Sequence, residues 1–393
     1  MELIFNAEAL RPPITGVGNY SFHLLRQFLA SDEVDAVHCF TGTHWQDGEA
    51  QRRATDALIA QGGQGSPGGA GRLLQKVRQA VGLVPGSKAA YDALMARRFS
   101  RHANSLPGAI YHETNYILKP YDGPCVTTVH DLSHMRFPQF HPPHVVQWLD
   151  RKLPATLARA DRVITVSDVV RDELLAHFDL PAEKVCTVYE GVDKDYVPRD
   201  AAATAPVLDA HGLDHKAYVL LVATLEPRKG IDVLLAAWEQ LPVALRRECP
   251  LVLTGSSGWL NKELLGRLEA LKRDGSVRHL GYVPSSQLPA LFSGAAVFCY
   301  PSVYEGFGLP VLDAMSSGVP VICRAGTSMA EFSRGACLLC DSGEPEELAQ
   351  KLRQLLTDES ERDRWGRLGR ERSADFSWER CARETLQVYR QVA

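Results

Sequence analysis

The stretch AVFCYPSVYEGFGLPVLDAMSSGVPVI, from Ala296 to Ile322, decides the fold of this chain. Its apolar residues at 296–300 predict a buried strand, and the glycine-bearing loop that follows leads into a predicted helix at 308–317. A second apolar run then begins at residue 319. Strand, loop, helix and strand in this order predict a βαβ unit of a parallel sheet.

Units of the same kind extend over most of the chain. The run AYVLLVA at 217–223 is almost continuously apolar, as expected for a strand buried on both faces of a sheet. Just before it, the polar segment 193–212 is rich in Ala, Asp and Pro and is interpreted as a domain linker. The predicted fold class is α/β, with two doubly wound parallel-sheet domains, 1–195 and 196–376, that face a shared cleft.

Length and composition agree with two globular domains. The 393 residues suffice for two cores at about 100–200 residues per domain. With 45% hydrophobic and 23% charged residues, the composition excludes a disordered chain or a coiled coil. The start, MELIFNAEA, has acidic residues where a signal peptide needs basic and apolar ones, and no apolar run reaches 18 residues. We therefore expect no signal peptide and no membrane span.

The nine cysteines are an odd number and lie in apolar segments, which predicts buried reduced thiols and a cytoplasmic protein. Cys337 and Cys340 have the spacing of a zinc or redox pair, but no second pair or nearby histidine completes a metal site. We therefore expect these two cysteines to lie in a strand.

One part of the chain is strongly basic although the net charge is only −4. Between residues 51 and 102 there are nine basic residues against two acidic ones. The segment RLLQKVRQAVGLV within it has a weakly amphipathic pattern suited to an anionic membrane surface, although a solvated helix face explains it equally well. We expect no nucleic-acid partner.

The first candidate ligand loop is TGVGNYS, which lies between a predicted strand and a predicted helix. Gly16 and Gly18, with Val17 between them, allow the backbone to approach a ligand, and the helix start offers N–H groups to an anion. Ser21 stands where a dinucleotide fingerprint has its third glycine, which argues against a dehydrogenase. A tight turn without a ligand is the remaining alternative.

The second candidate loop, LEPRKG, follows the buried strand at 217–223. Arg228 and Lys229 are adjacent and can neutralise a diphosphate, the arginine as a fork and the lysine as a point charge. They directly precede a predicted helix, where the macrodipole disfavours cations. This unfavourable placement favours a binding role over two solvated charges.

The opening stretch contributes two carboxylates. Glu305 lies at the mouth of the helix that follows Gly308, and Asp313 lies about one and a half turns into it. Both carboxylates can therefore face one cleft. Carboxylates suit sugar hydroxyls, because each accepts more than one hydrogen bond.

A histidine-rich segment, VHDLSH, follows a predicted strand. His130 and His134 lie four residues apart, with further histidines nearby, so a metal site is one alternative. The prolines at 138, 142 and 143 argue against the helix that such spacing needs. A packed or capping histidine is a second alternative, and a histidine of the catalytic cleft is the interpretation that we favour for His130.

Taken together, TGVGNY, VHDLSH, VSDVVRDEL, EGVD, LEPRKG and the segment ending in DAMSSGVPVI resemble glycosyltransferase family 4, the retaining enzymes of the GT-B fold. The resemblance extends over nearly the whole chain, in the family's order. It implies two Rossmann-like domains, an acceptor on the N-terminal one and a nucleotide-sugar donor mainly on the C-terminal one. It also implies that the last helix, about 377–393, packs back on the first domain, and that Asp193 belongs to a hinge and not to a metal motif.

The resemblance implies roles for individual residues. Arg228 and Lys229 would bind the diphosphate, Glu226 would orient them, and His130 would approach the donor sugar at the reacting centre. Further donor contacts would come from Glu305 and from the loop backbones at Gly16, Val17, Gly18, Gly306, Phe307, Gly308 and Leu309. The family usually has a second glutamate, which binds the ribose, where this chain has Asp313, a side chain one methylene shorter.

These features predict a retaining glycosyltransferase that needs neither a metal nor another cofactor. The overall look favours a GDP-mannose or GDP-rhamnose donor and a saccharide or lipid-linked saccharide acceptor of surface polysaccharide or O-antigen synthesis. A UDP-sugar donor and a non-catalytic nucleotide-sugar-binding protein are the alternatives. The basic stretch 51–102 would hold the protein at the cytoplasmic face of the inner membrane.

Overall fold

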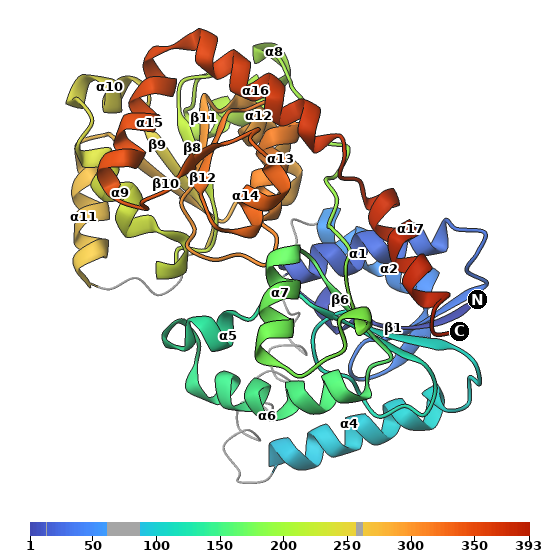
Figure 1. The fold of residues 1–393 in the computed structure, drawn as a ribbon. Helices are drawn as coiled ribbons and strands as arrows, with labels where there is room; N and C mark the ends of the chain where they lie inside the picture. The colour runs from blue at the N-terminus through green and yellow to red at the C-terminus, as the bar shows by residue number, and fades with distance from the viewer. Residues whose placement is uncertain (13, 61–86, 257–261) are drawn as a thin grey trace.

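A computed structural model describes residues 1–12, 14–60, 87–256 and 262–393, and for residues 87–92 and 262 the backbone alone. The chain forms two α/β halves, each built on its own mainly parallel sheet (Figure 1). The predicted fold class, two Rossmann-like parallel-sheet domains, is thus confirmed.

The N-terminal sheet has seven strands in the order β3-β2-β1-β4-β5-β6-β7. The strands are β1 (Glu2–Asn6), β2 (Ala36–Phe40), β3 (Trp45–Asp47), β4 (Ile110–Glu113), β5 (Cys125–Val129), β6 (Arg162–Thr165) and β7 (Val185–Thr187). All pairs are parallel except β2 with β3. The sequence pattern missed β3, because three mainly polar residues at an edge show no periodicity.

Helices cover both faces of this sheet. They are α1 (Gly16–Leu29), α2 (Gly48–Ala60), α4 (Ser87–Ala103), α5 (Ser133–Arg136), α6 (Pro143–Arg159) and α7 (Asp168–His177). Helix α7 follows β6 and directs its N-terminal end toward the other half of the molecule, where it contacts α14 (Ser328–Ser333) (Figure 1).

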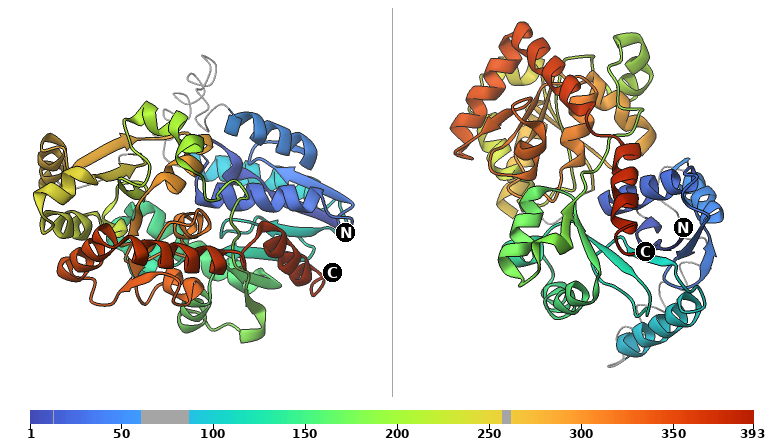
Figure 2. Two further views of the ribbon diagram at one scale, coloured as in Figure 1. Left: turned by 90° about the horizontal axis from the view of Figure 1, so that it is seen from above. Right: turned by 45° about the vertical axis from the view of Figure 1, so that its right-hand side comes forward.

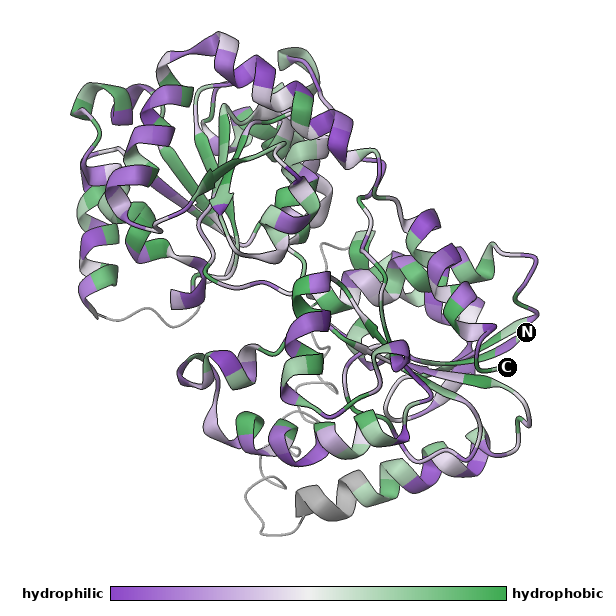
Figure 3. Ribbon diagram, viewed as in Figure 1, coloured by the Kyte–Doolittle hydropathy of each residue, from purple (hydrophilic) through white to green (hydrophobic). Residues whose placement is uncertain are grey.

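The C-terminal sheet has six parallel strands in the order β10-β9-β8-β11-β12-β13. The strands are β8 (Val219–Val222), β9 (Leu251–Thr254), β10 (Val277–Gly281), β11 (Val297–Tyr300), β12 (Val321–Arg324) and β13 (Leu338–Cys340). The helices, besides α14, are α8 (Ala201–Leu208), α9 (Ile231–Glu239), α10 (Val243–Glu248), α11 (Lys262–Arg273), α12 (Leu288–Gly294), α13 (Leu309–Ser316), α15 (Pro345–Thr357) and α16 (Glu359–Ser373). The inner strands are hydrophobic and the outer helix faces are largely hydrophilic (Figure 3), which is the pattern of a sheet buried on both sides. The edge strand β10 carries the exposed Arg278.

The interpretation of 193–212 as a linker is wrong for its second half. Residues 201–208 form α8, whose N-terminus is capped by Asp200. Thr204 and Leu208 are buried, and the helix packs on α12. The alanines that suggested a linker are good helix formers, and Leu208 joins the core of the C-terminal half.

The chain crosses between the halves twice, and the two crossings lie side by side. Val192 forms a parallel bridge with Ser377, and a Cβ at Gly191 would collide with the backbone of Trp378. Asp193 lies at this crossing with its carboxylate 3.6 Å from His23 of α1. Beyond it, α17 (Trp378–Tyr389) packs against α1, which brings the two termini close together (Figure 2).

Candidate functional site

Two loops meet at the carboxyl ends of neighbouring strands in the C-terminal half. Strand β8 leads into the loop with Glu226 and a 3-10 turn, Pro227–Lys229, before α9. Its neighbour β11 leads into the loop that ends at Gly308. Because strands β8 and β11 are adjacent in the sheet but not in the chain, their ends form the topological switch point where such sheets bind ligands.

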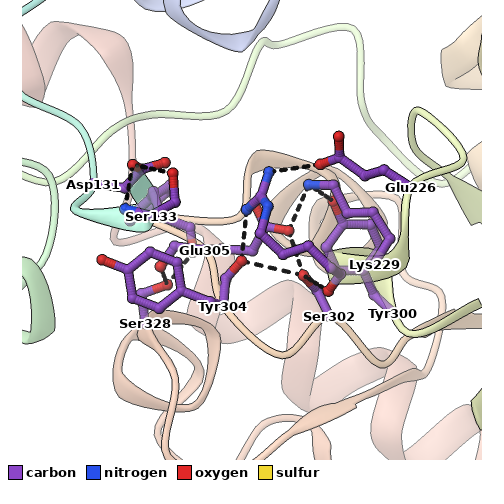
Figure 4. Close-up of polar contacts among 12 residues, drawn as sticks. Asp131, Ser133, Glu226, Lys229, Tyr300, Ser302, Tyr304, Glu305 and Ser328 are labelled. Atoms are coloured by element: carbon purple, nitrogen blue, oxygen red, sulfur yellow. Dashed lines mark hydrogen bonds and ion pairs between the residues drawn. The ribbon is translucent and has the colours of Figure 1, made fainter. Parts of the chain in front are cut away.

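Glu305 is the centre of the polar cluster at this point (Figure 4). Its Oε1 atom lies 2.6 Å from the Lys229 Nζ atom and accepts a hydrogen bond of 2.6 Å from the Ser302 hydroxyl. Its Oε2 atom lies 3.3 Å from Arg228 Nη1. The Arg228 guanidinium also donates to Glu226 at 3.0 Å and to the Tyr304 carbonyl at 2.6 Å. Two cations and two carboxylates therefore share one site.

The buried side chains of this cluster remain ionised. Burial alone would raise the pKa of Glu305, but Lys229 and Arg228 outweigh it and lower that pKa to about 2. Burial alone would lower the pKa of Lys229, and the Glu305 carboxylate raises it above its ordinary value. Glu305 is thus ionised and Lys229 charged at neutral pH, and Lys229 and Arg228 are the cations that could bind an anionic ligand.

The backbone of the loop at 305–308 is held on both sides. The Ser328 hydroxyl of α14 is within hydrogen-bond distance of the Glu305 and Phe307 carbonyls, at 2.9 and 2.8 Å. The Ser167 hydroxyl of the N-terminal half donates to the Gly306 carbonyl at 2.7 Å. A Cβ at Gly306 would overlap the carbonyl oxygen of His130, so only glycine fits this contact.

The rest of this loop serves packing. The Phe307 ring stacks on Phe332 with ring centroids 4.7 Å apart, so only the Phe307 backbone is left for a ligand. Gly308 has a positive φ of 110° and precedes α13. Leu309 packs against the cores of both halves.

His130 lies at the junction of the two halves and is 7% exposed. Its Nε2 atom is 2.8 Å from the Thr114 carbonyl, which can only accept, so this nitrogen carries a proton. Its Nδ1 atom lies 3.6 Å from the buried Glu190 carboxylate. Tyr20 of α1 packs edge-on against the ring at 4.9 Å. The structure thus brings His130 beside Gly306.

The glycines of TGVGNYS differ from each other. Gly16 is the exposed first residue of α1, and a Cβ there would meet nothing within 4 Å. Gly18 is buried, and a Cβ there would be 2.6 Å from the Ala9 carbonyl oxygen. The first turn of α1 reaches His130 through Ser21, which bonds to both the Val17 carbonyl and the Thr114 hydroxyl. Gly18 therefore serves packing, while Gly16 leaves its backbone open to a ligand.

Asp313 is the fifth residue of α13. Burial raises the pKa of Asp313 well above its ordinary value, and the nearby Asp193 and Glu190 raise it further. The sequence pattern predicted that the Glu305 and Asp313 carboxylates can face one cleft. The structure gives them opposite electrostatic surroundings, cationic for Glu305 and anionic for Asp313.

Several residues of the site were missed from the sequence: Ser167, Glu190, Tyr300, Ser302 and Ser328. Tyr300 and Ser302 stand within five residues of Glu305, and Glu190 opens the EGVD motif, so a local signal existed for these three. Ser167 and Ser328 reach the loop from other elements. Ser167 lies in the motif VSDVVRDEL, so a local signal existed for it, whereas nothing in the local sequence marks Ser328.

No set of three or more His, Cys, Asp or Glu side chains in the described residues is arranged to hold a metal ion. His134 is buried with Nε2 3.9 Å from Asp150. Cys337 and Cys340 are buried, and Cys340 ends β13.

Two family models match the chain, one in each half. Residues 14–196 match Glycosyltransferase Family 4, and residues 209–372 match glycosyl transferases group 1. The O-antigen chain mannosyltransferase B of Escherichia coli is 35% identical over 390 residues, which is 99% of this chain and 100% of that protein.

Solved structures share the fold over the full length. The HepE protein of Anabaena, in complex with UDP-glucose, has a TM-score of 0.69 at 17% identity and covers 100% of both chains. The sucrose-phosphate synthase of Thermosynechococcus elongatus has a TM-score of 0.71 at 21% identity, covering 100% of this chain and 98% of that one. The resemblance found in the sequence is confirmed, and the chain belongs to the GT-B glycosyltransferases of family 4, with a group 1 domain in its C-terminal half.

Proposed function

We propose that the protein transfers a mannosyl residue from GDP-mannose to a saccharide acceptor, with retention of configuration, during assembly of a lipopolysaccharide O-chain. The full-length similarity to the E. coli O-antigen mannosyltransferase supports the sugar and the pathway. The observation that carries the chemistry is the buried pair Arg228 and Lys229, held against Glu305 at the ends of β8 and β11.

The cation pair suits a departing nucleoside diphosphate. Lys229 and Arg228 each keep a full charge in a buried site, where charge stabilisation is far stronger than in water. The arginine fork matches two phosphate oxygens, and the lysine adds a point charge. The protein's own cations thus supply the charge that a divalent metal supplies elsewhere, and we propose a metal-independent reaction.

Glu305 has two tasks in this proposal. Its ionised carboxylate orients the Lys229 ammonium group, and it can accept hydrogen bonds from the hydroxyls of the donor sugar. Because Lys229, Arg228 and Ser302 already engage both of its oxygens, Glu305 is poorly placed to act as a covalent nucleophile. We therefore propose attack by the acceptor hydroxyl on the face from which the diphosphate leaves, with His130 beside the reacting centre.

The alternatives rest on other observations. A UDP-sugar donor is favoured by the similarity in fold to HepE, whose structure contains UDP-glucose. A non-catalytic nucleotide-sugar-binding protein would retain the cation pair without turnover.

Membrane contact through the basic stretch 51–102 is a separate part of the proposal, and its amphipathic segment at 72–84 lies outside the described residues. Helix α4 presents exposed Arg97, Arg98 and Arg101 together with Leu94, which is 55% exposed. In α2, by contrast, Arg52 is ion-paired with Glu49 and Asp56, so this arginine adds little free positive charge. No helix in the described part of the chain has the length and apolar character needed to span a bilayer. We propose that the exposed face of α4 lies on the anionic cytoplasmic leaflet, where a lipid-linked acceptor is found.

Vesicle sedimentation tests this contact. The wild-type chain should pellet with anionic vesicles at low salt and be released at high salt, because screening weakens surface charge. Replacing Arg97, Arg98 and Arg101 by Gln should abolish pelleting. Equal pelleting of wild type and variant would show that α4 is not the contact.

The transferase proposal is tested by turnover. Purified protein is incubated in EDTA with GDP-mannose, GDP-rhamnose or UDP-glucose and an O-chain saccharide acceptor, and the released nucleoside diphosphate and the anomeric configuration of the product are measured. We expect release from GDP-mannose alone and an axial product linkage like that of the donor. Release from UDP-glucose alone would favour the first alternative. Binding of a donor without release would favour the second.

A further inference from the structure

Helix α7 of the N-terminal half is capped by a carboxylate of the C-terminal half. The N–H groups of Asp168 and Val169 open the helix and have no partner within it. Each donates to one oxygen of Glu331, at 2.8 Å in both cases. Because Glu331 lies on α14, this carboxylate bridges the two halves at a helix end that favours negative charge.

Other side chains hold Glu331 in place. The Tyr189 hydroxyl lies 2.8 Å from its Oε1 atom and 3.2 Å from the Asp168 carboxylate. Asp168 in turn accepts a hydrogen bond of 2.6 Å from the Thr187 hydroxyl. Glu331 is therefore fixed by groups of the N-terminal half although it belongs to the other half.

The two ends of this contact lead directly to the loop that bears Glu305. Ser328, three residues before Glu331, bonds the carbonyls of residues 305 and 307. Ser167, the residue before α7, donates to the carbonyl of Gly306. Three successive carbonyls are thus held by the starts of α14 and α7, and Glu331 joins those two helices.

Helix α7 makes a second contact with this loop, through Tyr304. The Tyr304 hydroxyl donates to Glu173 of α7 at 2.6 Å and accepts from the Leu132 N–H at 2.9 Å. Arg136 lies 3.1 Å from the same glutamate. Tyr304, the residue directly before Glu305, is therefore also bound to α7. The position of α7 thus helps to fix the position of the loop.

We propose that Glu331 is a positioning residue, which by capping α7 from the opposite domain latches the two halves with the Glu305 loop seated on His130. Glu331 does not bind the donor. It acts through α14 and α7, whose N-terminal ends hold the loop. The loop contacts His130 only when the two halves are in this relative position. In its kinetic consequence this inference rests on the proposed transfer reaction.

The chain offers a matched control. Glu347 of α15 also accepts from two backbone N–H groups, those of Asp341 and Ser342, at 3.1 and 2.9 Å. This contact lies within one domain and does not involve α7. Substitution of either glutamate removes a carboxylate that accepts from two backbone N–H groups, but only Glu331→Gln removes such a contact between domains.

The test combines hydrogen exchange with kinetics on the full chain. In Glu331→Gln, amide exchange at the start of α7 should rise about tenfold, from the loss of a charge-assisted cap. Turnover with GDP-mannose should fall at least tenfold while the dissociation constant of GDP stays within twofold, because the binding residues are intact. Glu347→Gln should change neither the exchange of α7 nor turnover.

Unchanged exchange at α7 in Glu331→Gln would overturn the latch, as would an equal loss of turnover in both variants. A parallel loss of GDP affinity would also overturn it, because Glu331 would then act on the binding site. A wild-type chain without turnover would count against the proposed function and not against the latch, which the exchange measurement decides alone.

Discussion

Glu305 and Glu113 are both buried carboxylates at the carboxyl end of a parallel strand, and each lies beside a lysine. Glu305 touches Lys229 at 2.6 Å and Arg228 at 3.3 Å, and its pKa falls to about 2. For Glu113 burial raises the pKa, and Lys119 at 3.5 Å does not offset it. The Glu113 carboxylate is satisfied by Asn6 and Tyr111, at 2.5 and 2.6 Å, which are neutral groups.

The surroundings of Glu305 and Glu113 distinguish a carboxylate suited to a ligand site from a structural one. A second cation and direct contact keep Glu305 charged, with two cations at hand for an anion. Neutral partners and a single lysine at 3.5 Å fit Glu113 to a structural task, joining β1 to β4. Substitutions at Glu305 and Glu113 test this difference.

The largest contrast is expected in turnover. Glu305→Gln leaves Lys229 and Arg228 without their shared counter-charge and removes the acceptor for sugar hydroxyls, so kcat should fall by roughly 10²–10³. Glu113→Gln keeps the shape and most hydrogen bonds of its site, and kcat should stay within about threefold. Steady-state kinetics with GDP-mannose measures both, and similar losses in the two variants would erase the distinction.

Whether the sequence predicts such a site depends on how far apart in the chain its interacting residues lie. Arg228, Lys229 and Glu305 could be named because each lies in a loop between a strand and a helix. The two cations precede a helix start, where the macrodipole disfavours them, and Glu305 lies in a glycine-bearing loop. The hydrogen bond from the Asn6 amide to the Glu113 carboxylate spans 107 residues of chain, and that from the Asp168 N–H to the Glu331 carboxylate spans 163. Such pairs depend on how the strands and domains assemble, which no local pattern records.

Elements of the fold were likewise predicted correctly where their own residues carry the signal, and missed where tertiary contacts decide. The apolar runs at 217–223 and 296–300 became β8 and β11, because strands buried on both faces leave a strong signal. Helix α8 was missed because its capping residue and its two buried side chains lie in a segment of polar and small residues. Its packing on α12 comes from tertiary contact and not from its own pattern.

A smaller contrast is expected in stability. Lys229→Met leaves the Glu305 carboxylate buried with only Arg228 and should destabilise the fold by about 3 kcal/mol. Lys119→Met should cost only about 1 kcal/mol, since the raised pKa of Glu113 allows this carboxyl to take up a proton instead. Urea unfolding at pH 7 measures both. Equal costs would show that the two lysines are equivalent.

The two carboxylates should also respond to pH with opposite signs. The lowered pKa of Glu305 contributes about 3 kcal/mol of stability above pH 4.5, which is lost as the pH falls toward 2. The raised pKa of Glu113 contributes stability below its ordinary range, which is lost as the pH rises through the raised value.

Urea unfolding of wild type, Glu305→Gln and Glu113→Gln from pH 3 to 8 tests this pair of signs. The deficit of Glu305→Gln should grow as the pH rises from 3 to 5. The free energy of unfolding of Glu113→Gln should increase relative to that of the wild type as the pH rises further. Parallel curves for the two variants would contradict the assigned pKa directions.

The smallest effect is expected at Asp313. Asp313→Glu adds one methylene of reach toward a ribose and should tighten GDP binding by about threefold, a fraction of a well-made charged hydrogen bond. Titration of GDP measures it, with Asp313→Asn as the companion variant. A loss of affinity in Asp313→Glu would show that Asp193 and Glu190 leave no room for the longer side chain.

The central claim is that the protein's own cation pair binds the diphosphate of the donor. Calorimetric titration of GDP and UDP in EDTA tests it most directly, on wild type, Lys229→Met and Lys216→Met. Lys216 is the control, since its ammonium group donates to the Ser293 and Ala295 carbonyls within the same domain. We predict that one of the two nucleotides binds in EDTA, that Lys229→Met weakens it by roughly 10–100-fold, and that Lys216→Met leaves it unchanged. Binding only on addition of a divalent cation, or equal affinity in wild type and Lys229→Met, would contradict the claim.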